Sequence, residues 1–333
     1  MGLAPIPLSV LDLASVGAGE SVRASFDGSV QLAQRAEQLG YRRIWYAEHH
    51  NIEAIASSAT AVLIAHVAAH TERIRLGAGG IMLPNHAPLV IAEQFGTLET
   101  LHPGRIDLGL GRAPGTDQRT ARALRRDQSA ADTFPQDVLE LQGYLTGDTL
   151  IRSVHAVPGR GTNVPLYILG SSLFGAQLAA ALGLPYAFAS HFAPAALHDA
   201  VAQYREQFRP SAQLDRPHVI AGINVIAADT EAEAQEQLRL TRRARARHLF
   251  GRDGRRLTDD EADRLLESPR AIAVNQMMIY TAVGTPDVVK EQVEAFAGHA
   301  DADELMVVHQ TASIPTRLRS LELLADVTGV VPA

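Results

Sequence analysis

The chain has 333 residues, of which 46% are hydrophobic and 20% are charged, a balance that supports a large buried core and argues against general disorder. Its formal net charge of -7 repels polyanions, so the composition argues against broad binding of nucleic acid. The chain has no cysteine, which excludes disulfides, thiolate metal sites and thiol nucleophiles.

The amino-terminal segment, MGLAPIPLSVLDLA, lacks the basic start of a secretion signal. The most apolar long segment, Ala59–Ala69, contains His66 and is far shorter than the roughly 20 residues that cross a bilayer. We therefore expect a cytoplasmic protein without a membrane span.

Short apolar runs alternate with amphipathic stretches along the whole chain, which is the pattern of parallel βα units. Eight such units predict an α/β fold, a (β/α)8 TIM barrel that forms a single domain over residues 1–333. The expected strands are Pro7–Ala14, Arg43–Ala47, Ile74–Ile81, Ile106–Gly111, Leu166–Gly170, Tyr186–Ser190, Val219–Ala227 and Glu304–His309. The expected helices include Asp27–Leu39, Ala59–His70, Leu89–Leu101, Gly175–Leu182, Ala195–Phe208 and Pro286–Ala297.

Two stretches are longer than a simple βα unit needs. Residues Thr116–Asn163 follow the fourth strand, and Thr230–Thr285 follow the seventh; we interpret both as insertions in the barrel. The second contains an arginine-rich run, Arg239–Arg256, followed by acidic residues. This charge pattern is more typical of a solvated, salt-bridged helix than of a nucleic-acid-binding arm.

A doubly wound open sheet is the alternative architecture. Its dinucleotide fingerprint, G-x-G-x-x-G, is incomplete after both candidate strands, because the third strand ends in GAGGIM and the fourth in GLGRAP. The sequence therefore favours the closed barrel.

Chemistry in such a barrel comes from the carboxyl ends of the strands and the loops that follow them. The second strand runs into WYAEHHN, which brings Glu48, His49 and His50 to that edge. A histidine there can act as general acid or base near neutral pH, and a neighbouring carboxylate tunes its basicity. The alternative is a pair of structural histidines.

The sequence does not predict a metal site. It has no H-E-x-x-H motif, and His49 and His50 are adjacent, so their side chains leave a strand on opposite sides. His66 and His70 stand one turn apart on an expected outer helix, where we predict that they face solvent or pack.

Glycine ends the third strand twice, at Gly79 and Gly80. Glycine at such a position permits close approach of a ligand. A β-bulge or a tight barrel corner is an equally good explanation.

Small residues also end the fifth strand, where Gly170, Ser171 and Ser172 lead into a helix that contains Gly175. Ser172 can cap this helix while the N–H groups of its first turn point at an anion such as phosphate. Arg112, after the fourth strand, can add a charge-assisted partner. The alternative is an ordinary serine cap and a surface arginine.

Three blocks of the chain, in this order, resemble the bacterial luciferase-like flavin monooxygenase family in its alkanal monooxygenase-type branch. They are WYAEHHN, RLGAGGIMLPNHAPLVIAEQFGTLETLHPGRIDLGLGRAPG and LYILGSSLFGAQLAAALGLPYAFASHF. The resemblance spans nearly the whole chain and implies the barrel fold. It also implies an FMN-dependent oxidoreductase that receives reduced FMN from a separate flavin reductase. Oxygen would add at the flavin C4a position, and the hydroperoxide would oxidise a small-molecule organic substrate.

The resemblance also implies roles for individual residues. His49 matches the family's catalytic histidine, and Gly79 and Gly80 match a pair joined by a non-prolyl cis peptide bond behind the flavin ring. Arg112 and Ser172 match phosphate-binding residues. Luciferase has a threonine where this chain has Gly175, so backbone N–H donors are expected to contribute more here.

Weaker expectations follow from the same resemblance. Arg125 or Arg126 is a loose candidate for a second phosphate-binding arginine, and Arg252–Asn275 is expected to belong to a mobile lid. A homodimer is expected, with Ala59–His70 and Leu89–Leu101 as interface helices. Two other functions fit this fold: a deazaflavin-dependent oxidoreductase that transfers hydride without oxygen, and a flavin-binding barrel without catalysis.

Overall fold

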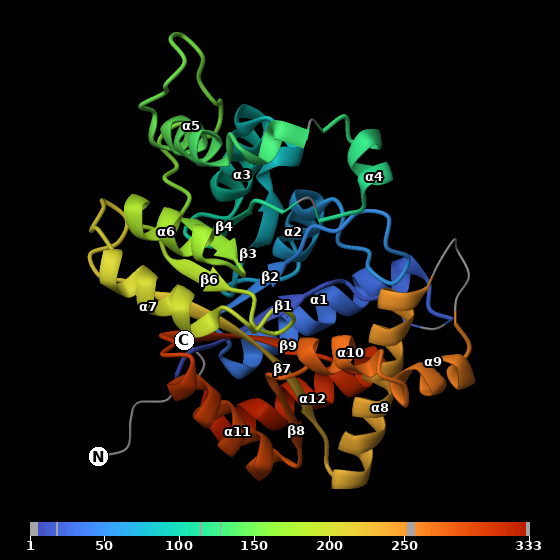
Figure 1. The fold of residues 1–333 in the computed structure, drawn as a ribbon. Coiled ribbons are helices and arrows are strands. Elements are labelled where there is room, and N and C mark those ends of the chain that lie inside the picture. The colour runs from blue at the N-terminus through green and yellow to red at the C-terminus, as the bar shows by residue number, and fades with distance from the viewer. Residues whose placement is uncertain (1–5, 18, 114, 127, 252–256, 331–333) are drawn as a thin grey trace.

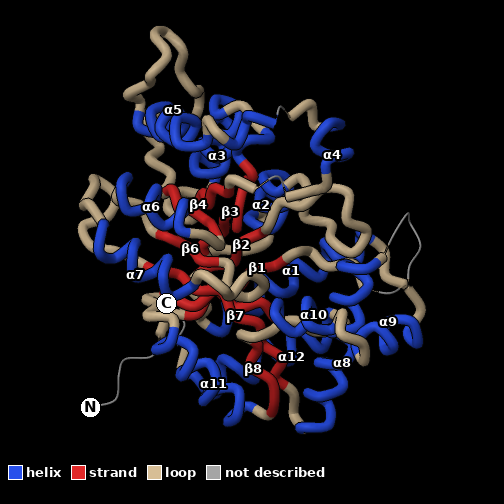
Figure 2. The backbone as a smooth tube through the Cα atoms, viewed as in Figure 1, coloured by secondary structure: helices blue, strands red, loops and turns tan. Residues whose placement is uncertain are grey.

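The computed structural model describes residues 6–17, 19–113, 115–126, 128–251 and 257–330. Parallel strands lie at its centre, and helices surround them (Figures 1 and 2). The strands are β1 (Leu8–Asp12), β2 (Arg43–Tyr46), β3 (Arg75–Met82), β4 (Ile106–Gly111), β5 (Leu166–Gly170), β6 (Tyr186–Phe188), β7 (Val219–Ala227), β8 (Thr281–Gly284) and β9 (Glu304–His309). The α-helices are α1 (Val22–Leu39), α2 (Thr60–Ala68), α3 (Pro88–Leu101), α4 (Gln118–Ala123), α5 (Phe134–Thr146), α6 (Leu173–Leu182), α7 (Leu197–Gln207), α8 (Glu231–Phe250), α9 (Asp259–Leu266), α10 (Ala271–Met277), α11 (Pro286–His299) and α12 (Ile314–Thr328).

Eight of the strands close into the predicted barrel. Each pairs in parallel with its neighbours in the order β1 to β7 and then β9, and pairing of β9 with β1 completes the circle. The first and last strands are thus neighbours, so the barrel needs nearly the whole chain. The TIM-barrel prediction is confirmed.

Two details of the sequence prediction were wrong. The strand β8 was missed: it pairs only with the second half of β7, from Asn224 to Ala227, and lies outside the closed circle. Helix α1 begins at Val22 and not at Asp27, because Ser21 caps it by accepting a hydrogen bond from the Ala24 N–H.

A buried ion network fills the amino-terminal end of the barrel. Arg43, the first residue of β2, lies 2.7 Å from Asp107 of β4 and 2.9 Å from Glu304 of β9, measured between charged atoms. It also donates to the Tyr167 hydroxyl at 2.6 Å, and Trp45 Nε1 donates to Asp107 at 3.1 Å. This end is therefore closed by paired charges, and the opposite end is left for chemistry.

The insertion after β7 forms a helical layer. The helices α8, α9 and α10 pack through a small apolar cluster that includes Ala246, Ala262 and Val274, and Thr241 of α8 donates to the carbonyl of Gln310 after β9 at 2.7 Å. Residues 252–256 of the expected lid lie outside the described residues. The rest of that segment includes α9 and α10.

Candidate active site

The carboxyl ends of adjacent strands hold the residues that the sequence singled out. The Gly115 carbonyl accepts from the His50 N–H at 3.3 Å, which joins the loop after β4 to the end of β2. Three residues before Gly115, Arg112 has its guanidinium carbon 4.2 Å from the ring centroid of Phe174 in α6. A continuous series of contacts thus links the ends of β2, β4 and β5.

His49 follows β2 and donates its backbone N–H to the Ser57 carbonyl at 3.1 Å. Burial lowers the pKa of its imidazole; the Gly115 carbonyl and Glu48 oppose this shift, and the charge of His248 in α8 adds to it. The net shift is downward, so His49 is mainly neutral at pH 7. A neutral imidazole has a free lone pair, which a general base requires.

A second imidazole, that of His191 after β6, lies near His49. Burial, with the charges of Arg245 and His49, lowers the pKa of His191 to about 3. Its ring lies against Gly222 of β7, where a β carbon would be 2.3 Å from Nδ1. Asn224 donates to the His191 carbonyl at 2.7 Å. Gly222 therefore leaves room for this ring, and the Asn224 amide holds the backbone of His191.

Glu48 is buried and joins the ends of β2 and β3. Its carboxylate contacts Nε2 of His50 at 2.9 Å and Nε2 of His86 at 3.0 Å, and it accepts from Asn85 at 3.0 Å and from the Met82 N–H at 2.9 Å. Burial raises its pKa, but the bonds and charge of its partners outweigh burial and lower it. The Glu48 carboxylate, His50, His86, Asn85 and the Met82 N–H are called the Glu48 cluster below.

Replacing the central carboxylate is expected to loosen these strand ends. We expect Glu48→Gln to lower the free energy of unfolding by about 1–3 kcal/mol, because an amide NH2 would face hydrogen-bond donors that now have a carboxylate. Denaturant unfolding at pH 7 measures this, with the exposed Glu53→Gln as matched control. Equal unfolding midpoints for the two variants would show that the cluster does not stabilise the fold.

The peptide bond between Gly79 and Gly80 is cis, as the resemblance implied. The pairing of β3 with β4 also shifts register between Ala78 and Ile81, so the bulge considered from sequence is present too. A β carbon would lie 2.9 Å from Leu11 at Gly79 and 2.7 Å from the Gly109 carbonyl oxygen at Gly80. Packing in the barrel wall therefore requires both glycines.

The start of α6 lies beside the end of β5. Ser172 occupies the N-cap position, but its side chain makes no capping hydrogen bond, so the predicted serine cap is wrong. Ser171 and Ser172 are exposed. The hydroxyl of Ser172 and the N–H groups of the first turn are thus left for a ligand.

Tyr186 of β6, which the sequence analysis did not identify, holds this helix start. Its hydroxyl donates to the Ser172 carbonyl at 3.0 Å. A β carbon at Gly175 would lie 3.2 Å from Tyr186 Cε2, and one at Gly170 would lie 3.6 Å from the Gly175 Cα atom. Contact with Tyr186 gives a physical reason for glycine at the position where luciferase has threonine.

Arg126 supplies a second guanidinium near Arg112, because its NH2 group donates to the Arg112 carbonyl at 3.3 Å. This contact favours Arg126 over Arg125 among the two sequence candidates. His66 of the outer helix α2 and His70, two residues after its end, are exposed, as predicted.

Sequence reasoning missed three residues that contact this region: His86, Tyr186 and Arg245. Proximity to His49 in the chain gives no signal for them, because they come from other strand ends and from α8. His191, by contrast, directly follows the expected sixth strand, and the barrel rule locates it there.

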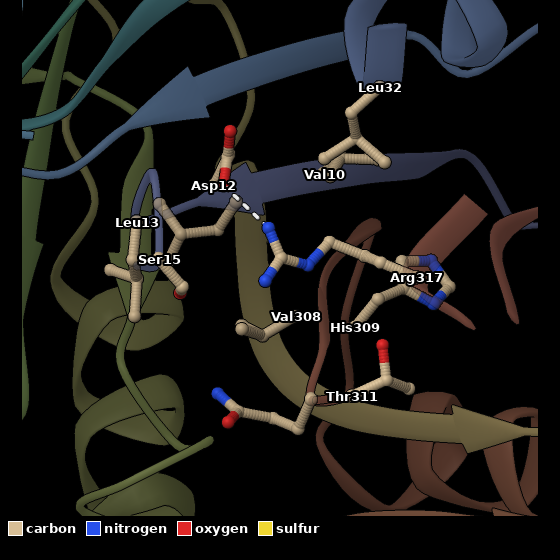
Figure 3. Close-up of a pocket in the computed structure, with 11 residues that line it drawn as sticks. Val10, Asp12, Leu13, Ser15, Leu32, Val308, His309, Thr311 and Arg317 are labelled. Carbon is tan, nitrogen blue, oxygen red and sulfur yellow. Dashed lines mark ion pairs between the residues drawn. The ribbon is translucent and has the colours of Figure 1, made fainter. Parts of the chain in front are cut away.

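One small cavity lies in the wall between β1, β9 and the helices α1 and α12 (Figure 3). Asp12 and Arg317 face each other across it at 3.6 Å. Its volume of about 30 Å³ fits one or two water molecules and cannot contain a flavin.

Within the described ranges, no three histidine, cysteine or acidic side chains are grouped so that they could hold a metal ion. Over the same residues, no helix has both the length and the apolar character needed to span a membrane.

Fold and site together define a (β/α)8-barrel protein with its functional groups at the carboxyl ends of the strands. The chain belongs to the luciferase-like monooxygenase family, which matches residues 6–302. It is 50% identical to protein YvbT of Bacillus subtilis (96% of each chain) and 48% identical to the luciferase-like monooxygenase of Escherichia coli K12 (97% of each). It is 32% identical to the N-acetyl-S-alkylcysteine monooxygenase of Bacillus subtilis, over 96% of this chain and 98% of that one.

Solved structures share the fold. Apo-MsnO8 superposes with a TM-score of 0.87 at 35% identity, covering 98% of this chain and 100% of the other. The oxygenating component of the Pseudomonas putida 3,6-diketocamphane monooxygenase in complex with FMN gives 0.70 at 16% identity (96% and 97%). An F420-dependent secondary alcohol dehydrogenase with an F420-acetone adduct gives 0.71 at 14% identity (97% and 99%).

Proposed function

We propose that this protein is a monooxygenase that uses reduced FMN and molecular oxygen to oxidise a small organic substrate. The observation that carries the proposal is the grouping of neutral His49, Arg112 and the uncapped start of α6 at neighbouring strand ends, with the cis Gly79–Gly80 bond within β3 between them. Family membership supports the reaction class.

The residues of the α6 side fit a phosphate-bearing flavin. The free Ser172 hydroxyl and the backbone N–H groups beside Gly175 would donate hydrogen bonds to the phosphate, and Arg112 and Arg126 would neutralise it. Gly170 and Ser171 would border it, and Gly79 and Gly80 would lie behind the ring. Bound reduced FMN would supply the electrons that activate oxygen, and His49 would hold or move a proton beside it.

A substitution tests the phosphate assignment. We expect Arg112→Met to weaken binding of reduced FMN about 10-fold or more while leaving riboflavin binding unchanged, because riboflavin has no phosphate. Anaerobic equilibrium titration measures both affinities. The exposed Arg119→Met is the matched control, and an equal loss of affinity for FMN and riboflavin would contradict the assignment.

The reaction class can be tested without a known substrate. Protein loaded with reduced FMN is mixed rapidly with oxygenated buffer, and absorbance spectra are recorded. We expect reoxidation to pass through a species that differs from both reduced and oxidised FMN. Reoxidation at the rate of free reduced FMN, without such a species, would contradict oxygen activation.

Hydride transfer with a deazaflavin is the second candidate, because a fold neighbour binds F420. FMN is preferred because the EHH sequence at His49 resembles the luciferase branch. Tighter binding of reduced deazaflavin than of reduced FMN, with hydride transfer in the absence of oxygen, would reverse this choice. Storage of flavin without catalysis is the third candidate, and variants of His49 discriminate it.

The partners of this reaction would be a separate flavin reductase and a second copy of the chain. Exposed apolar side chains on α2 and α3, among them Val62, Val90 and Leu101, are suited to a homodimer interface. Sedimentation equilibrium of the wild type and of Val62→Glu tests this assembly.

A further inference from the structure

The helix α8 carries five arginines, and one of them differs from the others. Arg239, Arg242, Arg243 and Arg247 pair with Glu236, Asn275, Asp263 and Asp259, respectively. Within the part of the chain that the structure describes, Arg245 makes no hydrogen bond and no ion pair. It is also partly buried, where an unpaired charge is costly.

The position of Arg245 on the helix directs it to the barrel mouth. Thr241, Arg245 and His248 are spaced by four and three residues and so share one face of α8. Thr241 donates to the Gln310 carbonyl after β9, whereas Ala246 on another face packs against α9 and α10. The face that holds Arg245 is therefore the one turned to the strand ends.

The electrostatics agree with this placement. The charge of Arg245 lowers the pKa of both His191 and His248, and the charge of His248 lowers that of His49. Burial lowers the pKa of Arg245 itself, and among the described residues no carboxylate opposes the shift. A guanidinium nevertheless stays protonated at neutral pH, so its fixed positive charge acts on His191 and His248.

We propose that Arg245 binds an anionic group of the substrate, so that the substrate class is small organic anions, carboxylates in particular. The inference rests on the proposed function and adds substrate specificity to it. A carboxylate matches the guanidinium with two hydrogen bonds, and its charge compensates a group that the described residues leave unpaired. Phe192, exposed and 4.9 Å from His191 between ring centroids, offers an apolar surface to the carbon skeleton.

Flavin phosphate is the other possible source of an anion. The contacts described above assign phosphate to the α6 start, with Arg112 and Arg126. Arg245 instead acts on His191 and His248, on the side of β6 and α8. The substrate is therefore the better partner for Arg245, and the experiment separates the two sources.

The test is calorimetric titration with pairs of a carboxylate and its neutral amide of nearly the same shape: hexanoate and hexanamide, benzoate and benzamide, N-acetylmethionine and its amide. It is done with the full chain carrying oxidised FMN, so it requires no turnover. We expect at least one carboxylate to bind about 10-fold or more tightly than its amide. Arg245→Met should abolish that difference, Arg245→Lys should retain part of it, and Arg242→Met, the matched control, should retain all of it.

Two results would overturn the proposal. One is that no carboxylate binds more tightly than its amide, or that Arg245→Met keeps the preference. The other is that Arg245→Met weakens FMN binding but not riboflavin binding, which would place Arg245 at the phosphate. The calorimetric titration involves no reaction with oxygen. A negative titration therefore leaves the test of the monooxygenase reaction unaffected, and a negative result in that test leaves the preference for carboxylates measurable.

Discussion

Arg43→Met is expected to lower the free energy of unfolding by up to about 3–5 kcal/mol, because it removes the cation that the buried carboxylates of Asp107 and Glu304 share. Asp107 keeps Arg75 as a partner, which limits the loss. Methionine keeps an unbranched side chain of intermediate length and so limits the packing change. Denaturant unfolding at pH 7 measures the effect. The matched control is Arg23→Met, which removes an exposed ion pair with Asp27 and should change stability by less than about 1 kcal/mol.

The pH dependence gives this prediction a second readout. Burial raises the pKa of Glu304, but Arg43, His218 and Ser9 outweigh it and lower the pKa to about 2. The stability from Glu304 is therefore fully present above its ordinary value of 4.5 and is lost as pH falls from there toward 2. The stability difference between wild type and Arg43→Met should narrow over that range. Equal midpoints at pH 7 would contradict a stabilising network.

Most of the fold could be predicted from sequence because its signals are local. All eight barrel strands pair in the order in which they occur, and each lies in a continuous apolar run flanked by helical periodicity. The strand β8 escaped because TAVG has four residues and its pairing partner, the outer half of β7, lies far away in sequence. A short strand that pairs only with the part of β7 beyond the closed barrel has no sequence pattern that identifies it.

The site was predictable only where chemistry follows a strand directly. His49 and Arg112 stand at such positions, and the rule for barrels finds them. The absent Ser172 cap could not be predicted, because whether a hydroxyl turns to its own helix depends on neighbours such as Tyr186. Arg245 belongs to a run of arginines that the sequence alone does not tell apart. It differs from the other four on α8 because they have partners in the folded protein.

The Glu48 cluster bears on the two interpretations of EHH, because it includes one of the two histidines and leaves out the other. His50 contributes to structure, since its ring contacts the buried carboxylate of Glu48. His49, the adjacent residue, is not among the partners of that carboxylate and lies instead toward His248 and His191. Because side chains alternate along the extended chain, the two imidazoles point in different directions. His50 therefore has a structural role, and His49 is the candidate base.

His49→Ala is expected to lower oxidation by about 10²–10⁴-fold while leaving the affinity for reduced FMN within about 2-fold of the wild type, because a positioned base contributes roughly that much to rate. The expectation follows from the lowered pKa of His49, which keeps its lone pair free at pH 7. Product formation is measured with reduced FMN, oxygen and whichever substrate a panel of thioethers, aldehydes and ketones identifies.

The pH dependence of the oxidation rate distinguishes a catalytic base from a structural residue. If His49 must be neutral, the wild-type rate should be constant above its ordinary pKa of 6.5 and fall at lower pH, as the imidazole takes up a proton. His50→Ala is the matched control. Because this substitution removes a partner of Glu48, it should lower the free energy of unfolding but leave the shape of the pH profile largely unchanged. If His49→Ala oxidises substrate as fast as the wild type, other groups carry out the catalysis. If both proteins bind reduced FMN but form no product, flavin storage is favoured.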